Sequence, residues 1–277
     1  MLLALAGFGA VYAMSEIHLR DVAEPRPFEH TIPTDSGSIE RGRYIARTRG
    51  CFGCHGQRLE GKDFSEQWDW PARAVAPNLS RYAREHDAAT IAAAIRQGIG
   101  ASGKGLVSMP SYNFTRLSNA DTAALIAFLR STPVVDSELP GPELGWIARL
   151  DLALGRETSY AHWVQHVPER RLVSESERAH GEYLAMTMCN ECHGLDLRGY
   201  DFNGSLAPDL AIVGAIELTE FERIIRTGRG LGERHLGLMS LVAPDRYSVL
   251  TDQDVHALHL YLSSLLGEPV PQNVFWR

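Results

Sequence analysis

Apolar residues recur along most of the chain at intervals of three and four positions, which is the spacing of one face of an α-helix. The final helix of this kind in each half begins with a capping residue, Ser118 or Thr251, followed three positions later by an aspartate. The apolar stripes behind these caps consist of Leu125, Phe128 and Leu129 in one half and Leu258, Tyr261 and Leu262 in the other. No alternation of apolar and polar residues competes with this period. The pattern therefore predicts an all-α fold in which long loops join the helices.

The N-terminal segment is the longest uncharged stretch near either end of the chain. Its first 14 residues, MLLALAGFGAVYAM, carry no charge, and Glu16 is the first ionisable side chain. A helix of 14 residues is about 21 Å long, shorter than the ~30 Å hydrocarbon core of a bilayer. We expect residues 1–17 to be an uncleaved membrane anchor; cleavage after Ala13, or a buried helix of an ordinary domain, are the alternatives. The polar stretch 18–37 is a linker, which predicts that the anchor lies apart from the rest of the chain.

An internal repeat relates the two halves of the chain. The sequence CFGCHG at 51–56 recurs as CNECHG at 189–194, and many surrounding residues recur in the same order. The matched pairs include Gly42 and Gly181, Leu59 and Leu197, Pro77 and Pro208, Gly98 and Gly228, and Met109 and Met239. A glycine at the end of a helix favours a left-handed cap, so Gly98 and Gly228 each predict the end of a middle helix.

The repeat predicts two tandem domains, at 38–132 and 174–266. Residues 133–173 form the linker between them, with a stiff proline-containing beginning and one short amphipathic helix within 146–167. Residues 267–277 remain as a C-terminal tail.

Each copy contains the pattern Cys-x-x-Cys-His, the attachment sequence for c-type haem. Two thiols at this spacing form thioethers with the two haem vinyl groups, and the adjacent histidine ligates the iron. The residues concerned are Cys51, Cys54 and His55 in the first copy and Cys189, Cys192 and His193 in the second. A structural zinc site, a thioredoxin-like redox pair and two local disulfides are the alternatives, but none of them accounts for both histidines. The sequence predicts two covalently bound haem c groups, each with its iron.

A haem with six iron ligands needs one more side chain on the opposite face. Met109 and Met239 coincide under the repeat, whereas the other methionines have no such counterpart. Core packing is the alternative role for a single methionine, and His235 is a rival ligand to Met239 because Ser240 stands where the first copy has Pro110. A thioether ligand stabilises ferrous iron and raises the reduction potential, which suits electron transfer.

Composition and charge narrow the class of protein. The chain has 277 residues, of which 44% are hydrophobic and 22% charged, as in ordinary globular proteins long enough for two small cores. Lys and Arg number 27 and Asp and Glu 34, so the formal net charge is -7. This negative field repels nucleic acid, and we expect no nucleic-acid partner.

The chain resembles the class I cytochrome c family. The resemblance rests on both Cys-x-x-Cys-His sequences, on the Pro-Asn-Leu and Pro-Asp-Leu loops that begin at Pro77 and Pro208, and on Met109 followed by proline. It implies two tandem class I cytochrome c domains behind an N-terminal hydrophobic helix. It also implies that the carbonyls of Pro77 and Pro208 accept a hydrogen bond from the iron-ligating histidines, and that the terminal helix of each domain crosses the helix carrying Gly42 or Gly181.

This arrangement is similar to the cytochrome subunits of bacterial membrane-bound dehydrogenases. The resemblance implies an electron carrier that is not itself an enzyme, anchored on the periplasmic side of the inner membrane. It would relay single electrons between a redox partner, a dehydrogenase or oxidase complex, and the respiratory chain. A haem enzyme of the dihaem peroxidase type and a cytochrome subunit of a haem-copper terminal oxidase are the alternatives. The cytochrome subunits of dehydrogenases that oxidise alcohols commonly have three haem domains. This chain has two, so the resemblance implies no substrate.

Two further pairs of residues invite a functional interpretation. His162 and His166 stand four positions apart, as metal ligands on a helix do, but no carboxylate or thiol partner is evident. Trp68 and Trp70 lie in a stretch that only the first copy has; either they cover the edge of the haem or they form a docking surface.

Overall fold

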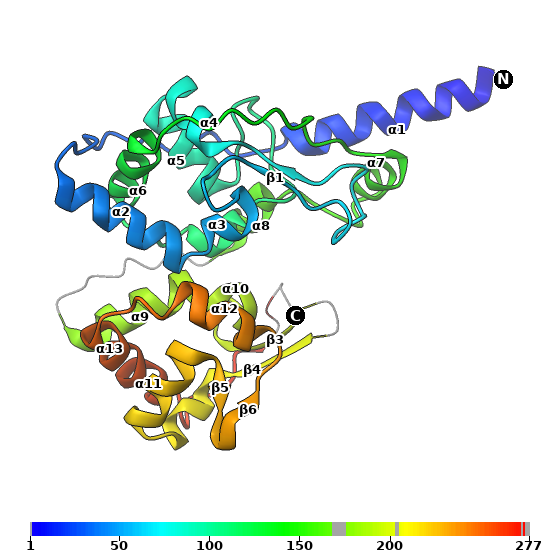
Figure 1. Ribbon diagram of the computed structural model, residues 1–277. Helices are drawn as coiled ribbons and strands as arrows, with labels where there is room; N and C mark the ends of the chain where they lie inside the picture. Colours follow the sequence, from blue (N-terminus) through cyan, green and yellow to red (C-terminus); the bar gives the residue numbers. More distant parts are fainter. Residues whose placement is uncertain (1, 168–175, 203–204, 273, 275–277) are drawn as a thin grey trace. The chain divides into compact units, whose positions relative to one another are not determined.

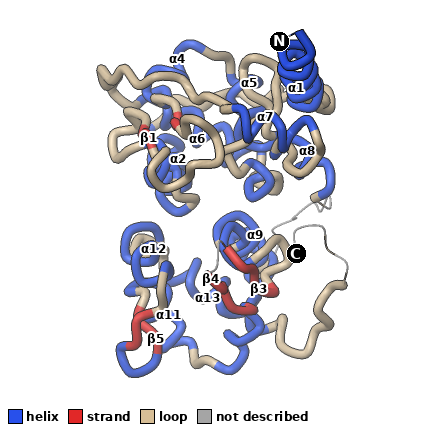
Figure 2. Tube along the Cα trace, turned by 90° about the vertical axis from the view of Figure 1, so that its right-hand side faces the viewer, coloured by secondary structure: helices blue, strands red, loops and turns tan. Residues whose placement is uncertain are grey.

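The computed structural model describes residues 2–167, 176–202, 205–272 and 274, and these form two compact units. The first unit holds the residues up to Ala46 and from Cys51 to Val167, and the second holds Arg47–Gly50 and the described residues from 176 onwards. Both are built mainly from helices, as Figures 1 and 2 show, and this confirms the predicted all-α class.

The helices of the first unit are α1 (Leu2–Arg20), α2 (Ser36–Thr48), α3 (Cys51–His55), α4 (Leu79–Glu85), α5 (Ala88–Gln97), the 3-10 helix η1 (Ser111–Phe114), α6 (Asn119–Ser131), α7 (Trp146–Ala153) and α8 (Tyr160–His166). Its strands β1 (Lys62–Asp63) and β2 (Val75–Ala76) form one antiparallel pair.

The helices of the second unit are α9 (Glu177–Met188), α10 (Asn190–His193), η2 (Leu210–Ala215), α11 (Leu218–Thr227), η3 (Leu231–Glu233), α12 (Leu238–Arg246) and α13 (Asp252–Ser263). Its strands are β3 (Arg198–Phe202), β4 (Ser205–Asp209), β5 (Arg229–Gly230) and β6 (Arg234–His235), which form two antiparallel pairs.

The predicted helix ends are confirmed. The hydroxyl of Ser118 accepts a hydrogen bond from the Asp121 amide at 3.0 Å, and Thr251 forms a full capping box with Asp254. The apolar stripes on α6 and α13, behind these caps, are buried. Gly98 ends α5 with φ 69° and Gly228 ends α11 with φ 68°, the left-handed caps that the sequence predicts.

A helix crossing without room for a side chain organises each unit. A Cβ placed on Gly42 of α2 would lie 2.0 Å from the carbonyl oxygen of Ala124 on α6. In the second unit, a Cβ on Gly181 of α9 would lie 1.9 Å from the carbonyl oxygen of Ala257 on α13. The terminal helix therefore crosses the helix that carries the repeated glycine, as the family resemblance implies. Only glycine allows the two backbones to approach so closely.

The structure differs from the sequence prediction in two local respects. The residues around each Pro-Asx-Leu loop form short antiparallel strand pairs, such as Lys62 opposite Ala76. The sequence has no alternation of apolar and polar residues there that would predict strands. The stretch 146–167 contains two helices, α7 and α8, where one was predicted. Such short elements are stabilised by the tertiary contacts around them rather than by local sequence preference.

The N-terminal helix α1 does not lie apart from the first unit, contrary to the expectation from the polar stretch behind it. It packs against α7, and Ser15 and Leu19 in its second half are buried. Figure 1 shows the first half of α1 extending beyond the rest of the unit. Of the helices that the structure describes, none combines the length and the apolar character that crossing a bilayer requires.

Candidate haem sites

In each unit the Cys-x-x-Cys-His sequence lies on one short helix. Cys51, Cys54 and His55 occupy α3, and the second copy occupies α10 together with the residue before it. In a helix, residues three and four positions apart share a face. One helical turn therefore presents both thiols and the imidazole on the same side, as attachment of a single flat ligand through all three requires.

Each histidine of these sequences is held by a proline carbonyl. Nδ1 of His55 lies 2.9 Å from the carbonyl oxygen of Pro77, and Nδ1 of His193 lies 2.8 Å from that of Pro208. A carbonyl oxygen can only accept, so Nδ1 carries the proton and donates, and Nε2 keeps its lone pair. Burial lowers the pKa of both imidazoles, more than these hydrogen bonds raise it. Both rings are therefore neutral near pH 7, with Nε2 available as a metal ligand.

The loop after each histidine has the same unusual backbone in both units. Leu59 and Leu197, both fully buried, adopt φ 61° and φ 63°, a left-handed conformation that is rare for leucine. The Leu59 carbonyl accepts from the Ser80 amide at 3.2 Å, and the Leu197 carbonyl accepts from the Leu210 amide at 2.9 Å. These bonds tie the loop behind the histidine to the loop that carries the proline. These hydrogen bonds thus help to hold the proline carbonyl in front of the imidazole.

The thiols of the second copy are poor candidates for thiolate chemistry. Burial, reinforced by the neighbouring Cys192 thiol, raises the pKa of Cys189 to about 12. Burial and the nearby Glu191 carboxylate raise the pKa of Cys192 to about 11, against the opposing effect of Arg246. A redox-active thiol pair depends on a thiolate, which this environment disfavours. An uncharged thioether fits the same surroundings without an electrostatic cost.

The two candidate methionine ligands lie at corresponding places in the units. Met109 is half-buried in the loop before η1, where its carbonyl accepts from the Ser111 amide at 2.7 Å. The Ser111 hydroxyl also donates to the Ala94 carbonyl at 2.7 Å, which fastens this loop to α5. Met239 is half-buried in the first turn of α12, and the adjacent Ser240 hydroxyl donates to the Gly228 carbonyl at 2.5 Å. Both methionines thus come after the glycine-capped middle helix and are fastened to it.

The rival ligand His235 is engaged elsewhere. It lies exposed on β6, and its Nδ1 accepts a hydrogen bond from the Gly237 amide at 3.1 Å. The lone pair of Nδ1 is therefore in use, and in the neutral ring the proton resides on Nε2. This arrangement favours Met239 over His235 as the ligand.

Comparison with known proteins agrees with this geometry. The family model of cytochrome c matches residues 39–133 and 179–266, which together make up more than half of the chain. The chain belongs to the cytochrome c family. Each matched region contains one helix crossing, one Cys-x-x-Cys-His helix and one histidine-proline hydrogen bond.

Several characterised proteins are similar to this cytochrome. It is 24% identical to the alcohol dehydrogenase (quinone) cytochrome c subunit of Gluconobacter oxydans, over 88% of this chain and 58% of the relative. It is 23% identical to the fructose dehydrogenase cytochrome subunit of Gluconobacter japonicus, over 87% of this chain and 54% of the relative. It is 28% identical to a nicotinate dehydrogenase subunit of Pseudomonas putida, over 96% of this chain but 25% of the relative. The chain thus spans about half the length of the first two relatives and a quarter of the third.

The residues of both sites fit covalently attached haem c. The histidines are neutral, oriented and protonated on the nitrogen that faces the proline, and each cysteine pair lies on the same helix as its histidine. His55 and His193 would hold the iron from one side, with Met109 and Met239 as the predicted ligands from the other. The structure brings each histidine together with its proline carbonyl; the iron ligation itself stays a prediction.

The other pairs singled out in the sequence have structural surroundings of their own. Trp68 and Trp70 stack with ring centroids 5.8 Å apart, and the Trp70 indole donates to the Asp151 carboxylate of α7 at 3.1 Å. His162 and His166 are exposed on α8, and Nδ1 of His166 contacts the His162 carbonyl at 2.9 Å. Within the described parts of the cytochrome, no cluster of three or more His, Cys, Asp or Glu residues is placed to hold a metal ion.

Sequence analysis did not predict the hydrogen-bonded side-chain pair that lies at each helix crossing. Arg41 of α2 donates twice to Asp121 of α6, with both distances 2.9 Å, and Nε2 of His180 on α9 lies 2.7 Å from Asp254 of α13. Arg41 and His180 each directly precede a crossing glycine, and both aspartates stand three positions after a helix cap. The repeat is the signal that would have found them, because Arg41 and His180 coincide once the crossing glycines are aligned.

A second missed pair adjoins the attachment sequence of the second unit. Arg246 of α12 donates to the Glu191 carboxylate at 2.7 Å, and Glu191 stands between the two cysteines of that sequence. The next residue, Tyr247, is buried and donates its hydroxyl to the Met188 carbonyl at 3.2 Å. These contacts fasten the end of α12 to the helix that carries the attachment cysteines.

Proposed function

We propose that this cytochrome is a dihaem electron-transfer subunit that relays single electrons between a partner dehydrogenase and the respiratory chain. The observation that carries the proposal is the repeated histidine-proline hydrogen bond, at 2.9 Å in the first unit and 2.8 Å in the second. The same arrangement of histidine and proline in both units supports two haem sites with the same kind of histidine ligation.

The chain's own residues would hold each cofactor rigidly. When bound, haem c supplies reversible one-electron chemistry at its iron. His55 and His193 would ligate through Nε2, while Pro77 and Pro208 prevent the rings from turning. The fully buried left-handed leucines and the glycine crossings leave the surroundings of the histidines little freedom to rearrange. A fixed ligand geometry in both oxidation states lowers the reorganisation that opposes electron transfer.

The kinds of protein it resembles support a dehydrogenase as the partner. The relatives include cytochrome subunits of alcohol and fructose dehydrogenases. We place the cytochrome on the periplasmic side of the inner membrane, where haem is attached to such sequences, with α1 as the membrane-associated segment. The exposed apolar side chains in the first half of α1 support its association with a membrane.

Mass measurement tests the cofactor content. The intact denatured chain should exceed the polypeptide mass by two haem groups, because each copy has a complete attachment sequence. The double variant Cys51→Ala/Cys54→Ala should carry one haem, and Cys189→Ala/Cys192→Ala should also carry one. As a matched control, His162→Ala/His166→Ala should retain both. A wild-type chain with fewer than two haems would contradict the proposal.

The optical spectrum and the reduction potentials test the ligand set. A carrier with both irons fully ligated should show no high-spin fraction at rest and no turnover of hydrogen peroxide, whereas a haem enzyme of the peroxidase type needs an open iron. Met239→Ala should lower the potential of one haem, and His235→Ala should leave both potentials unchanged. If instead His235→Ala lowers one potential and Met239→Ala changes neither, His235 is the ligand.

Purification of the intact complex tests the partner. Detergent-solubilised membranes should yield the cytochrome together with the catalytic subunit of a dehydrogenase. Adding the substrate of that dehydrogenase should reduce both haems, and the single-haem variant Cys189→Ala/Cys192→Ala should stop electron flow to the terminal acceptor. If the cytochrome copurifies with a haem-copper oxidase instead, and its haems exchange electrons only with that oxidase, the alternative partner is supported.

A further inference from the structure

A charged cluster holds α1 firmly against the first unit. Glu16 of α1 pairs with Lys104 at 2.6 Å and with Arg149 of α7 at 3.2 Å; we call these three residues the Glu16 cluster. The Arg149 guanidinium also lies 4.1 Å from the centre of the Tyr12 ring and donates to the buried Ser15 hydroxyl at 2.9 Å. The direction of α1 is therefore set by the domain and is not left to a flexible linker.

Beyond this cluster, α1 is apolar and exposed on every side. All residues from Leu5 to Met14 are exposed except Val11, which is half-buried. At 100° per residue, Met14 and Ile17 lie on the side of the helix opposite Tyr12, and all three side chains are exposed. A helix that is apolar all round is stable only where apolar material surrounds it.

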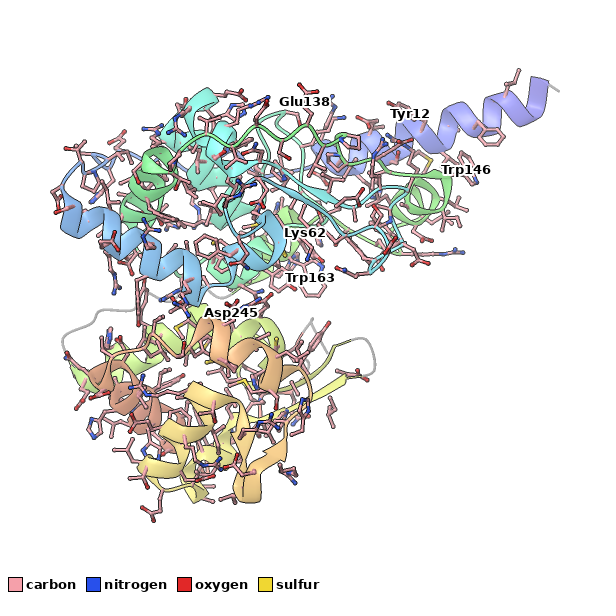
Figure 3. All side chains as sticks on the ribbon, in the orientation of Figure 1. Tyr12, Lys62, Glu138, Trp146, Trp163 and Asp245 are labelled. Carbon is pink, nitrogen blue, oxygen red and sulfur yellow. The ribbon has the colours of Figure 1, made fainter. Side chains whose placement is uncertain are left out.

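The outer face of α7 continues this apolar surface. Ile147 and Leu150 on α7 and Leu154, the residue directly after it, recur at helical spacing. Ile147 is 69% and Leu154 54% exposed, while Leu150 is half-buried. The Trp146 ring at the start of α7 lies 4.2 Å from the Phe8 ring of α1 and is also exposed. Figure 3 labels Tyr12 and Trp146 at the part of α1 that runs alongside α7. The two helices thus form one continuous surface.

We infer that α7 lies in the interface of a lipid bilayer while the first half of α1 is immersed in the hydrocarbon region of that bilayer. The inference deepens the proposed membrane location and rests on it. Exposure of α1 on all sides favours lipid, because the groove of a partner protein, or a second copy of this chain, would cover only one face.

The order of side chains along α1 fits this depth. The apolar residues come first, with the Trp146 ring of α7 beside Phe8, then Tyr12, then the Glu16 cluster. Aromatic residues with a polar atom concentrate at the level of the lipid headgroups, and charged groups lie outside it. With the Glu16 cluster joining the helices, immersion of α1 would bring the α7 stripe of Ile147, Leu150 and Leu154 to the headgroup level.

Binding to lipid vesicles tests the contribution of α7. The full haem-loaded chain should sediment with phosphatidylcholine vesicles and with phosphatidylethanolamine-phosphatidylglycerol vesicles, and should stay bound in high salt because the attraction is apolar. Ile147→Ser should weaken binding to both by about tenfold, since it removes one large apolar side chain from lipid. Leu231→Ser is the matched control, because Leu231 is 68% exposed but lies on η3 of the second unit. It should bind as the unaltered chain does.

A nitroxide label tests the position directly. On Ile147→Cys the label should become accessible to oxygen and shielded from a water-soluble relaxation agent when vesicles are added, whereas on Leu231→Cys it should remain in water.

If the full chain binds neither vesicle, the membrane location is wrong and the inference fails with it. If the full chain binds but Ile147→Ser binds equally well, the location stands and only the role of α7 is overturned. If the chain forms dimers without lipid, and Ile147→Ser converts them to monomers, the apolar surface binds a second copy of the chain and the inference is overturned.

Discussion

Replacing Gly42 by alanine should destabilise the first unit selectively. The new Cβ would lie 2.0 Å from the Ala124 carbonyl oxygen and 2.7 Å from the Phe128 Cβ, where ordinary contacts begin at 3.4 Å. The closer of these two atoms is backbone, so no side-chain rotation relieves the clash. Helices α2 and α6 would have to separate by more than an ångström and lose their packing along the crossing.

The size of the effect can be worked out from known costs of overpacking. Such substitutions typically cost about 1 to 3 kcal/mol, and alanine regains up to about 1 kcal/mol of helix propensity over glycine. Because the obstruction is a backbone carbonyl, we expect a net loss near the upper end, about 3 kcal/mol in the free energy of unfolding. With a urea m-value of about 1 to 1.5 kcal/mol/M for a domain of this size, the midpoint should fall by about 2 to 3 M.

Urea unfolding of the full haem-loaded chain is the assay, monitored by circular dichroism and by haem absorption. Gly42→Ala should move only the transition of the first unit, and Gly181→Ala only that of the second. Gly141→Ala is the control, since a Cβ there meets nothing within 4 Å, and it should shift the midpoint by less than the equivalent of about 0.5 kcal/mol. If Gly42→Ala and Gly141→Ala unfold at the same urea concentration, the close crossing of α2 and α6 does not exist.

Three further variants probe other parts of the molecule. Met109→Ala should lower the potential of one haem and leave the other unchanged in a potentiometric titration, because the thioether that favours ferrous iron is lost; two unchanged potentials would make Met109 a core residue. The hydrogen bond from Lys104 lowers the pKa of Glu16 below 4.5, so Glu16 stabilises the packing of α1 above about pH 4.5 and this contribution is lost as the pH falls through the lowered pKa. The melting temperature measured in detergent should accordingly decrease less between about pH 6 and pH 3 in Glu16→Gln than in the unaltered chain. An equal decrease in both proteins would refute the role of the carboxylate. Tyr247→Phe leaves the buried Met188 carbonyl without its donor and should cost about 1 to 2 kcal/mol in the urea unfolding of the second unit, whereas an unchanged midpoint would show that this bond contributes nothing.

Much of the candidate site could be predicted because its determinants are local. Two cysteines and a histidine at fixed spacing share a helical face whatever the rest of the chain does, and a cap such as Ser118 needs only the amides of the next helical turn. The repeat extended this reasoning to Met109 and Met239, since two copies of one fold place equivalent residues alike. Only the resemblance to a known family suggested that the Pro77 carbonyl would meet His55.

The tertiary structure decided the features whose partners are distant in sequence. Arg41 and Asp121 are separated by 80 positions and Glu16 and Arg149 by 133, so neither pairing leaves a local pattern. The strands beside Pro77 and Pro208 are too short to show an alternation, and form because the loops are already held together. The position of α1 was also decided by distant residues, because its sequence is that of an apolar helix followed by a polar linker. Its attachment to α7 depends on side chains that only the folded chain brings within reach, because an ion pair is specified by position in space and not by distance along the chain.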